Sequence, residues 1–138
     1  MPTSYYKLFY HFIWATKNRS PIITTQIENQ LKQFIPHKTL KLNAKQLKLE
    51  MVEDHLHLLA RIPPKISVSA FVNSIKGSSS HYINAILDEK IFYWQTGFGV
   101  LSLAEKQLPF VAEYIKNQKQ KHKDNDLISV FEEIPRLT

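Results

Sequence analysis

The feature that most constrains the fold is a period of two near the middle of the chain, over residues 55–62, where every second residue is apolar and the residues between them include two histidines. Successive side chains of a β-strand point to opposite faces, so this alternation predicts a strand with one face in an apolar core. The apolar positions are Leu56, Leu58, Ala60 and Ile62. The opposite face carries His55 and His57, which stand about 6.6–6.8 Å apart along such a strand. Two prolines at 63 and 64 end it.

The rest of the chain supplies partners for this strand. Strands are predicted over residues 5–16 and 46–52 and within 92–101, and helices begin near Thr25, Ser67 and Ser102. Thr25 and Ser102 are each followed three residues later by Glu, the pattern of a capping box. In the second helix, Gly77 indicates a kink or a close backbone approach.

This order of elements predicts an α+β protein with a ferredoxin-like, or RRM-like, antiparallel sheet of βαββαβ topology. Two helices then cover one face, and the first and third strands are central. The face that carries His55 and His57 is left for the C-terminal helix. We expect one domain over residues 1–138, with a tail from about residue 126 that is loose or contains a short docked segment.

Charge and composition narrow the function. The sequence has 18 Lys and Arg against 12 Asp and Glu, and residues 1–49 contain a single acid, Glu28. Such asymmetry favours a polyanionic partner, although a merely solvated basic surface is the alternative. There is no cysteine, so any metal must be held by His, carboxylate, amide or water. No signal peptide or membrane span is evident, and a cytoplasmic location is expected.

The C-terminal helix carries a second group of polar side chains. Tyr114 and Gln118 are four residues apart and share one side of the helix, just beside its apolar stripe. The simpler interpretation is that Tyr114 packs its ring at the edge of the core and exposes its hydroxyl to solvent. The His-x-His pair is likewise weak when taken alone, because the spacing occurs often by chance.

Five sequence segments, taken in their order along the chain, favour a functional role for both the His-x-His pair and Tyr114. They are HFIWATKNR, DHLHLLARIPP, SVSAFVNSIKGSSSHYIN, FYWQTGFGVLSL and YIKNQ. From about Tyr10 to His122 the chain resembles the HUH single-tyrosine transposases of the insertion sequence 200/605 group, including the REP-associated tyrosine transposases. The tail, which contains Glu132 and Glu133, lacks the strongly basic character that some relatives show there.

The resemblance implies a catalytic site. His55, His57 and Gln118 would hold a divalent metal, Mg²⁺ or Mn²⁺, and Tyr114 would attack single-stranded DNA. A free tyrosine is a poor nucleophile at neutral pH, whereas a metal on the scissile phosphate makes attack easier. Attack would leave a 5′-phosphotyrosine and a free 3′-OH, which can rejoin the strand later. Hairpin-forming element ends are the expected substrate, and a homodimer is the expected assembly. Family members often exchange the tyrosine helix between protomers, so Tyr114 acting in cis and Tyr114 acting in trans both stay open.

Other residues are assigned smaller roles. Four are candidate phosphate contacts: Lys17, Arg19, Lys76 and Lys116. His11 and His122 are candidates for orienting the metal ligands from outside. Two alternatives remain open. One is a module that binds single-stranded nucleic acid without cutting it. The other is a domesticated relative that acts on host repeats.

Overall fold

A four-stranded antiparallel sheet organises the protein. The computed structural model describes residues 4–135, and the sheet order is β2-β3-β1-β4. The strands are β1 (Phe9–Ala15), β2 (Lys45–Val52), β3 (His55–Arg61) and β4 (Gly99–Leu103). The helices are α1 (Thr25–Lys41), α2 (Val68–Leu87), α3 (Leu108–Lys116) and α4 (Gln118–Lys123). The expected βαββαβ topology with two central strands, β1 and β3, is therefore confirmed.

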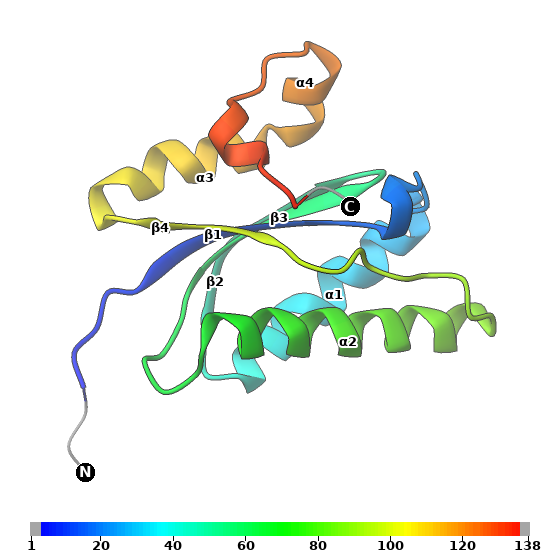
Figure 1. Ribbon diagram of the computed structural model, residues 1–138, viewed down its shortest axis with the longest axis horizontal. Helices are drawn as coiled ribbons and strands as arrows, with labels where there is room; N and C mark the ends of the chain where they lie inside the picture. Colours follow the sequence, from blue (N-terminus) through cyan, green and yellow to red (C-terminus); the bar gives the residue numbers. More distant parts are fainter. Residues whose placement is uncertain (1–3, 136–138) are drawn as a thin grey trace.

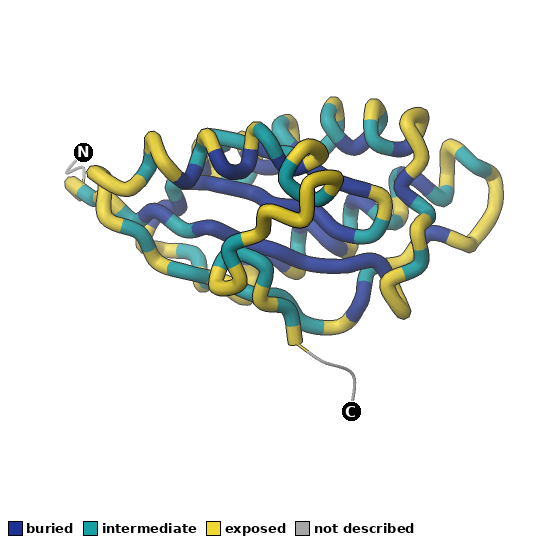
Figure 2. Tube along the Cα trace, turned by 90° about the horizontal axis from the view of Figure 1, so that it is seen from above, coloured by how far each residue is buried: buried dark blue, intermediate teal, exposed yellow. Residues whose placement is uncertain are grey.

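The two faces of the sheet are covered by different parts of the chain. α1 and α2 lie on one face, and α3, α4 and the short 3-10 helix η3 (Ser129–Glu132) lie on the other (Figure 1). The larger apolar core fills the α1/α2 side, where Leu56, Leu58 and Phe71 are fully buried. A smaller apolar cluster on the α3 side contains Leu59, Val111 and Ile115. Figure 2 shows that buried residues follow the middle strands, while the helices alternate buried and exposed residues and the loops between them are mostly exposed or half-buried.

Helix α1 begins one residue earlier than its sequence pattern suggests. The N-cap is Thr24, whose side chain accepts a hydrogen bond from the backbone N–H of Ile27. Ser67 caps α2 as expected, accepting from Ala70 N–H. Gly77 shows neither the kink nor the close backbone approach that were the two alternatives: α2 continues unbroken through it to Leu87, and no described atom beyond the adjacent residues and the helix's own backbone lies within 4 Å of the place that a Cβ would take.

The C-terminal helix differs more from expectation. Ser102 lies within β4 and caps no helix; after the strand, a 3-10 turn at Glu105–Gln107 leads into α3 at Leu108. The helical stretch is then interrupted at Asn117, whose φ of −97° and ψ of 22° end α3. Tyr114 therefore lies on α3, while Gln118 and His122 lie on α4.

A network of ion pairs fastens α4 to the edge of the sheet. Lys119 Nζ lies 2.8 Å from Glu28 Oε2 on α1 and 2.9 Å from Glu50 Oε1 on β2, and it donates to the carbonyl of Met51. Lys32 pairs with the same two carboxylates. These contacts hold α4 against strand β2 of its own chain. Among the described helices, none is long and apolar enough to cross a membrane.

Candidate metal centre and nucleophile

Three imidazoles and one carboxylate converge above β3. His55 and His57 come from the strand, His122 from α4 and Glu132 from η3. Glu132 Oε1 lies 3.3 Å from His55 Nε2, 3.2 Å from His57 Nε2 and 3.4 Å from His122 Nε2. His55 Nε2 and His122 Nε2 are 3.1 Å apart. We call these four side chains the His₃Glu cluster.

The two histidines of β3 are each contacted at Nδ1 by another side chain, so that each directs Nε2 into the cluster. His55 Nδ1 lies 2.7 Å from Asp54 Oδ1, and His57 Nδ1 lies 2.8 Å from His11 Nε2. Burial lowers the pKa of His11 to about 3, so this ring is neutral and can accept the Nδ1 proton of His57. Such partners fix the tautomer and orientation of metal-ligating imidazoles. His11 contacts His57 from outside the cluster, and its role in orienting a metal ligand stays a prediction.

The cluster fits a metal ion on two observations. Within the described part of the chain, His57 Nε2 is buried without a hydrogen-bond partner of good geometry. His55 and His122 also direct two Nε2 atoms at each other, an arrangement that needs a proton or a cation nearby. Imidazole nitrogen with one carboxylate oxygen is a donor set that suits transition ions, whereas Mg²⁺ prefers oxygen.

The carboxylate of Glu132 and the imidazole of His55 each stabilise the charged form of the other. Burial alone would raise the pKa of Glu132, but the adjacent imidazoles of His55 and His57 and the hydroxyl of Tyr114 outweigh it and hold that pKa well below its usual range. Burial likewise opposes the charged form of His55, yet Asp54 and Glu132 raise its pKa above the ordinary value. Glu132 therefore remains a carboxylate beside the imidazoles.

Tyr114 meets the same carboxylate from the other side. Its hydroxyl donates to Glu132 Oε2 and accepts from the backbone N–H of Ile128 at 3.1 Å. The residue is only 3% exposed. Burial, reinforced by Glu132, raises the pKa of Tyr114 to about 12. One carboxylate thus bridges the expected nucleophile and the three imidazoles.

Gln118, the residue expected to be the third ligand, is fully buried beside the cluster. Its Oε1 lies 2.8 Å from His122 Nε2, and its Nε2 donates to Glu132 Oε2 at 3.3 Å. His122, expected only to orient ligands from outside, instead directs Nε2 at His55 and Glu132. The structure therefore offers both Gln118 and His122 next to the two histidines of β3.

The candidate phosphate contacts fall into two groups. Lys17 and Lys116 are exposed, and Arg19 pairs with Asp54 at 3.2 Å beside the cluster. Lys76 differs from the expectation, because its buried ammonium donates to the carbonyls of Gln95, at 2.6 Å, and Gly97, at 2.8 Å. Lys76 joins α2 to the segment before β4 and does not offer its charge to a phosphate.

Sequence reasoning assigned no role in the site to Glu132. The tail from about residue 126 contains a docked segment, in which the centroid of the Phe131 ring lies 5.4 Å from that of His11 and 5.1 Å from that of Tyr114. The available signal was the apolar residues of the tail, Ile128, Val130 and Phe131, which suggest a short docked segment. Asp54, to which the sequence pattern assigns no role, contacts Nδ1 of His55 and orients its ring.

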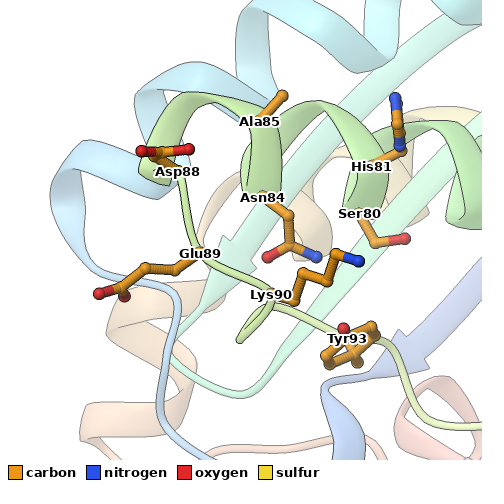
Figure 3. Close-up of a pocket in the computed structure, with 8 residues that line it drawn as sticks. All are labelled: Ser80, His81, Asn84, Ala85, Asp88, Glu89, Lys90 and Tyr93. Atoms are coloured by element: carbon orange, nitrogen blue, oxygen red, sulfur yellow. The ribbon is translucent and has the colours of Figure 1, made fainter.

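Two hollows of about 420 Å³ lie on the surface. One is at the C-terminal end of α2, where Tyr93 and Lys90 face Ser80 in Figure 3, away from the His₃Glu cluster. The other adjoins the cluster, because His122 forms part of its wall. Its remaining lining residues are Ile23, Thr25, Glu28, Val52, Glu53, Lys119 and Lys123. Of these two hollows, only the second reaches the His₃Glu cluster, and it does so at the half-buried ring of His122.

The chain is similar to known transposases over most of its length. The family described as "Transposase IS200 like" matches residues 4–118. The ISDra2 transposase TnpA of Deinococcus radiodurans is 26% identical over 84% of this chain and 87% of its own length. The transposase for insertion sequence element IS200 of Salmonella typhimurium is 28% identical over 88% of this chain and 83% of its own.

Solved structures show the same fold. A crystal structure of a Deinococcus radiodurans transposase aligns with a TM-score of 0.67 and 25% identity, covering 86% of this chain and 96% of that one. A REP-associated tyrosine transposase bound to a REP hairpin aligns with a TM-score of 0.65 and 20% identity, covering 88% and 73%.

Proposed function

Since this chain belongs to the family of IS200-like transposases, we propose that it nicks and rejoins single-stranded DNA through a 5′-phosphotyrosine on Tyr114. The observation that carries the proposal is the bridge made by Glu132. One carboxylate contacts both the Tyr114 hydroxyl and three Nε2 atoms, so a phosphate of similar size can do the same. A scissile phosphate placed there would touch the nucleophile and the metal ligands together.

In this proposal His55 and His57 hold a divalent ion, Mg²⁺ or Mn²⁺, together with Gln118, His122 or both. When bound, the ion supplies positive charge that orients the scissile phosphate and stabilises the leaving 3′-oxygen. His11 and Asp54 fix the rings of His57 and His55, so that little reorganisation is needed during the reaction. Tyr114 is held protonated until the phosphate arrives.

The proposed DNA partner is a single strand with hairpin-forming ends, handled in the cytoplasm. The basic side chains nearest the hollow beside His122 are Lys119 and Lys123. Arg19 flanks His55, with its Nη2 3.4 Å from Nδ1. Phosphates near these cations would fix the strand in register without reading its sequence. The solved relative that holds a REP hairpin makes a hairpin substrate the reasonable first choice.

We further propose that the protein forms a homodimer. Tyr114 reaches the His₃Glu cluster of its own chain, and Lys119 ties α4 to its own β2, so this arrangement is a site in cis. An exchange of helices between protomers would need that network to open. Mixing Tyr114→Phe protein with His57→Ala protein distinguishes the two arrangements. Restored cleavage indicates a site shared between chains, and no restoration indicates a site within one chain.

The proposed function is tested with labelled single-stranded hairpin DNA and Mn²⁺. Wild type is expected to form a covalent protein–DNA adduct that denaturation does not disrupt. Tyr114→Phe should form none, while the matched control Tyr82→Phe, which loses a hydroxyl on the opposite face, should behave as wild type. Metal-independent DNA binding with no adduct from any element-end substrate would instead indicate a non-catalytic binding module.

A further inference from the structure

The C-terminal segment from Ile128 to Glu133 occupies the face of the sheet on which the proposed chemistry takes place. Phe131 packs between His11 and Tyr114, and Ile128 N–H donates to the Tyr114 hydroxyl. The sheet has a place for this segment at Gly99 of β4, where any Cβ would collide with the carbonyl oxygen of Glu133. A strand position without a side chain therefore lets the tail lie close against β4.

This docked segment encloses the nucleophile. Tyr114 is 3% exposed and His57 is fully buried, so a DNA phosphate has no access to either in this arrangement. The group that stands between them is the Glu132 carboxylate, whose side chain is 14% exposed. A substrate can reach Tyr114 only if Glu132 leaves its position.

Four of the distances within the His₃Glu cluster fit the spacing of ligand atoms around one metal ion, with Glu132 as one ligand, and all four ligand atoms lie within 4.8 Å of one another. Ligand atoms held tetrahedrally about 2.0–2.1 Å from an ion such as zinc stand about 3.3–3.4 Å from one another. The three distances from Glu132 Oε1 to the imidazoles are 3.2, 3.3 and 3.4 Å, and His55 and His122 are 3.1 Å apart. Four protein ligands complete a tetrahedron, whereas catalytic sites keep one position open for substrate.

We propose that Glu132 is an exchangeable fourth ligand that closes the metal site, and that a phosphate oxygen of the DNA must replace it. This inference rests on the proposed function for the identity of the incoming ligand. The exchange is one anionic oxygen ligand for another and makes or breaks no covalent bond. Release of Glu132 also removes the acceptor of the Tyr114 hydroxyl, so opening the site and freeing the nucleophile are one event.

The first arm of the test measures the metal site without any DNA. Co²⁺ is titrated into wild type, Glu132→Gln and Glu133→Gln, and its visible absorption, strong for four-coordinate Co²⁺ and weak for six-coordinate Co²⁺, is recorded. Glu132→Gln is expected to bind Co²⁺ about tenfold more weakly and to give the weaker absorption. Glu133→Gln removes the same charge one residue away and should match wild type. If Glu132→Gln also matches wild type, Glu132 is no ligand and the inference fails.

The second arm measures binding of the labelled hairpin DNA by fluorescence anisotropy at saturating Mn²⁺. Glu132→Gln should bind about tenfold more tightly than Glu133→Gln, which controls for the lost negative charge. Phe131→Ala, which keeps the carboxylate but weakens the docking of the tail, should shift affinity in the same direction. Glu132→Gln binding no better than Glu133→Gln would overturn the idea that Glu132 blocks the DNA.

The two proposals can fail separately. Weaker Co²⁺ binding together with tighter DNA binding in Glu132→Gln, but no covalent adduct in any variant, supports the exchangeable ligand and contradicts cleavage by Tyr114. Conversely, a Tyr114-dependent adduct whose yield falls in Glu132→Gln at saturating metal makes Glu132 a participant in the reaction. That result overturns the exchange while leaving the proposed function in place.

Discussion

The two faces of strand β3 are equally buried but chemically opposite. Leu58 and His57 are neighbours in the sequence, and each is fully buried. Leu58 packs in the apolar core beneath the sheet, where burial itself stabilises the fold. His57 lies among polar groups, where burial costs free energy unless partners satisfy it. The apolar face of β3 therefore supplies the stability that offsets the cost of burying the His₃Glu cluster on the opposite face.

The largest effect is expected on the polar face. His57→Ala removes one Nε2 from the His₃Glu cluster and should reduce adduct formation by at least about a thousandfold, because metal and phosphate lose their position. The fold should survive, since the apolar core is untouched. Adduct yield and thermal unfolding are measured on the same preparation. Substantial adduct in His57→Ala would mean that the cluster is not the metal site.

The neighbouring residue should show the reverse behaviour. Leu58→Ala removes a fully buried side chain from the α1/α2 core and is expected to lower the free energy of unfolding by about 2–5 kcal/mol. Adduct formation by the folded protein at low temperature should be retained. Leu40→Ala, at a leucine that is 71% exposed, is the matched control and should change stability little. Denaturant unfolding measures both, and equal losses in the two variants would contradict the contrast between faces.

A buried lysine sharpens the distinction between structural and DNA-contacting cations. Lys76→Met removes hydrogen bonds to the Gln95 and Gly97 carbonyls and should cost about 1–3 kcal/mol of unfolding free energy. Affinity for single-stranded DNA, measured on folded protein, should not change. If Lys76→Met instead weakens DNA binding and leaves the free energy of unfolding unchanged, Lys76 contacts DNA phosphate, as the sequence predicts.

The smallest effect is expected at an exposed cation. Lys116 lies on the outside of α3, two residues after Tyr114, and Lys116→Gln should weaken DNA binding modestly for all sequences. The dependence of log affinity on log salt concentration should become shallower by about one unit. Anisotropy titrations at several salt concentrations measure this slope. An unchanged slope would remove Lys116 from the DNA interface.

The elements of the fold could be predicted because their patterns are local. The alternation in β3 and the apolar periodicity of α2 each state which side faces the core, and Ser67 marks where α2 begins. The position of His55 and His57 on the face opposite that core follows from the same two-residue period. The pairing of α3 and α4 with that face follows from topology.

What could not be predicted depends on contacts between distant residues. The inward direction of Lys76 is set by carbonyls that lie 19 and 21 residues further along the chain. The place of Glu132 depends on a docked tail, on Gly99 in β4 and on the position of Tyr114 at once. The interruption at Asn117 has no proline or glycine to mark it. Each of these features changes the site without changing the topology.

The interruption at Asn117 has a mechanical consequence. α3 is anchored through apolar contacts of Val111 and Ile115, while α4 is anchored through the ion pairs of Lys119. Tyr114, the proposed nucleophile, therefore lies on one helix, and Gln118 and His122, the proposed metal ligands, lie on another that is held by different contacts. A rotation of the backbone at Asn117 would move Tyr114 relative to Gln118 and His122 while the apolar contacts of α3 and the ion pairs of α4 stay intact.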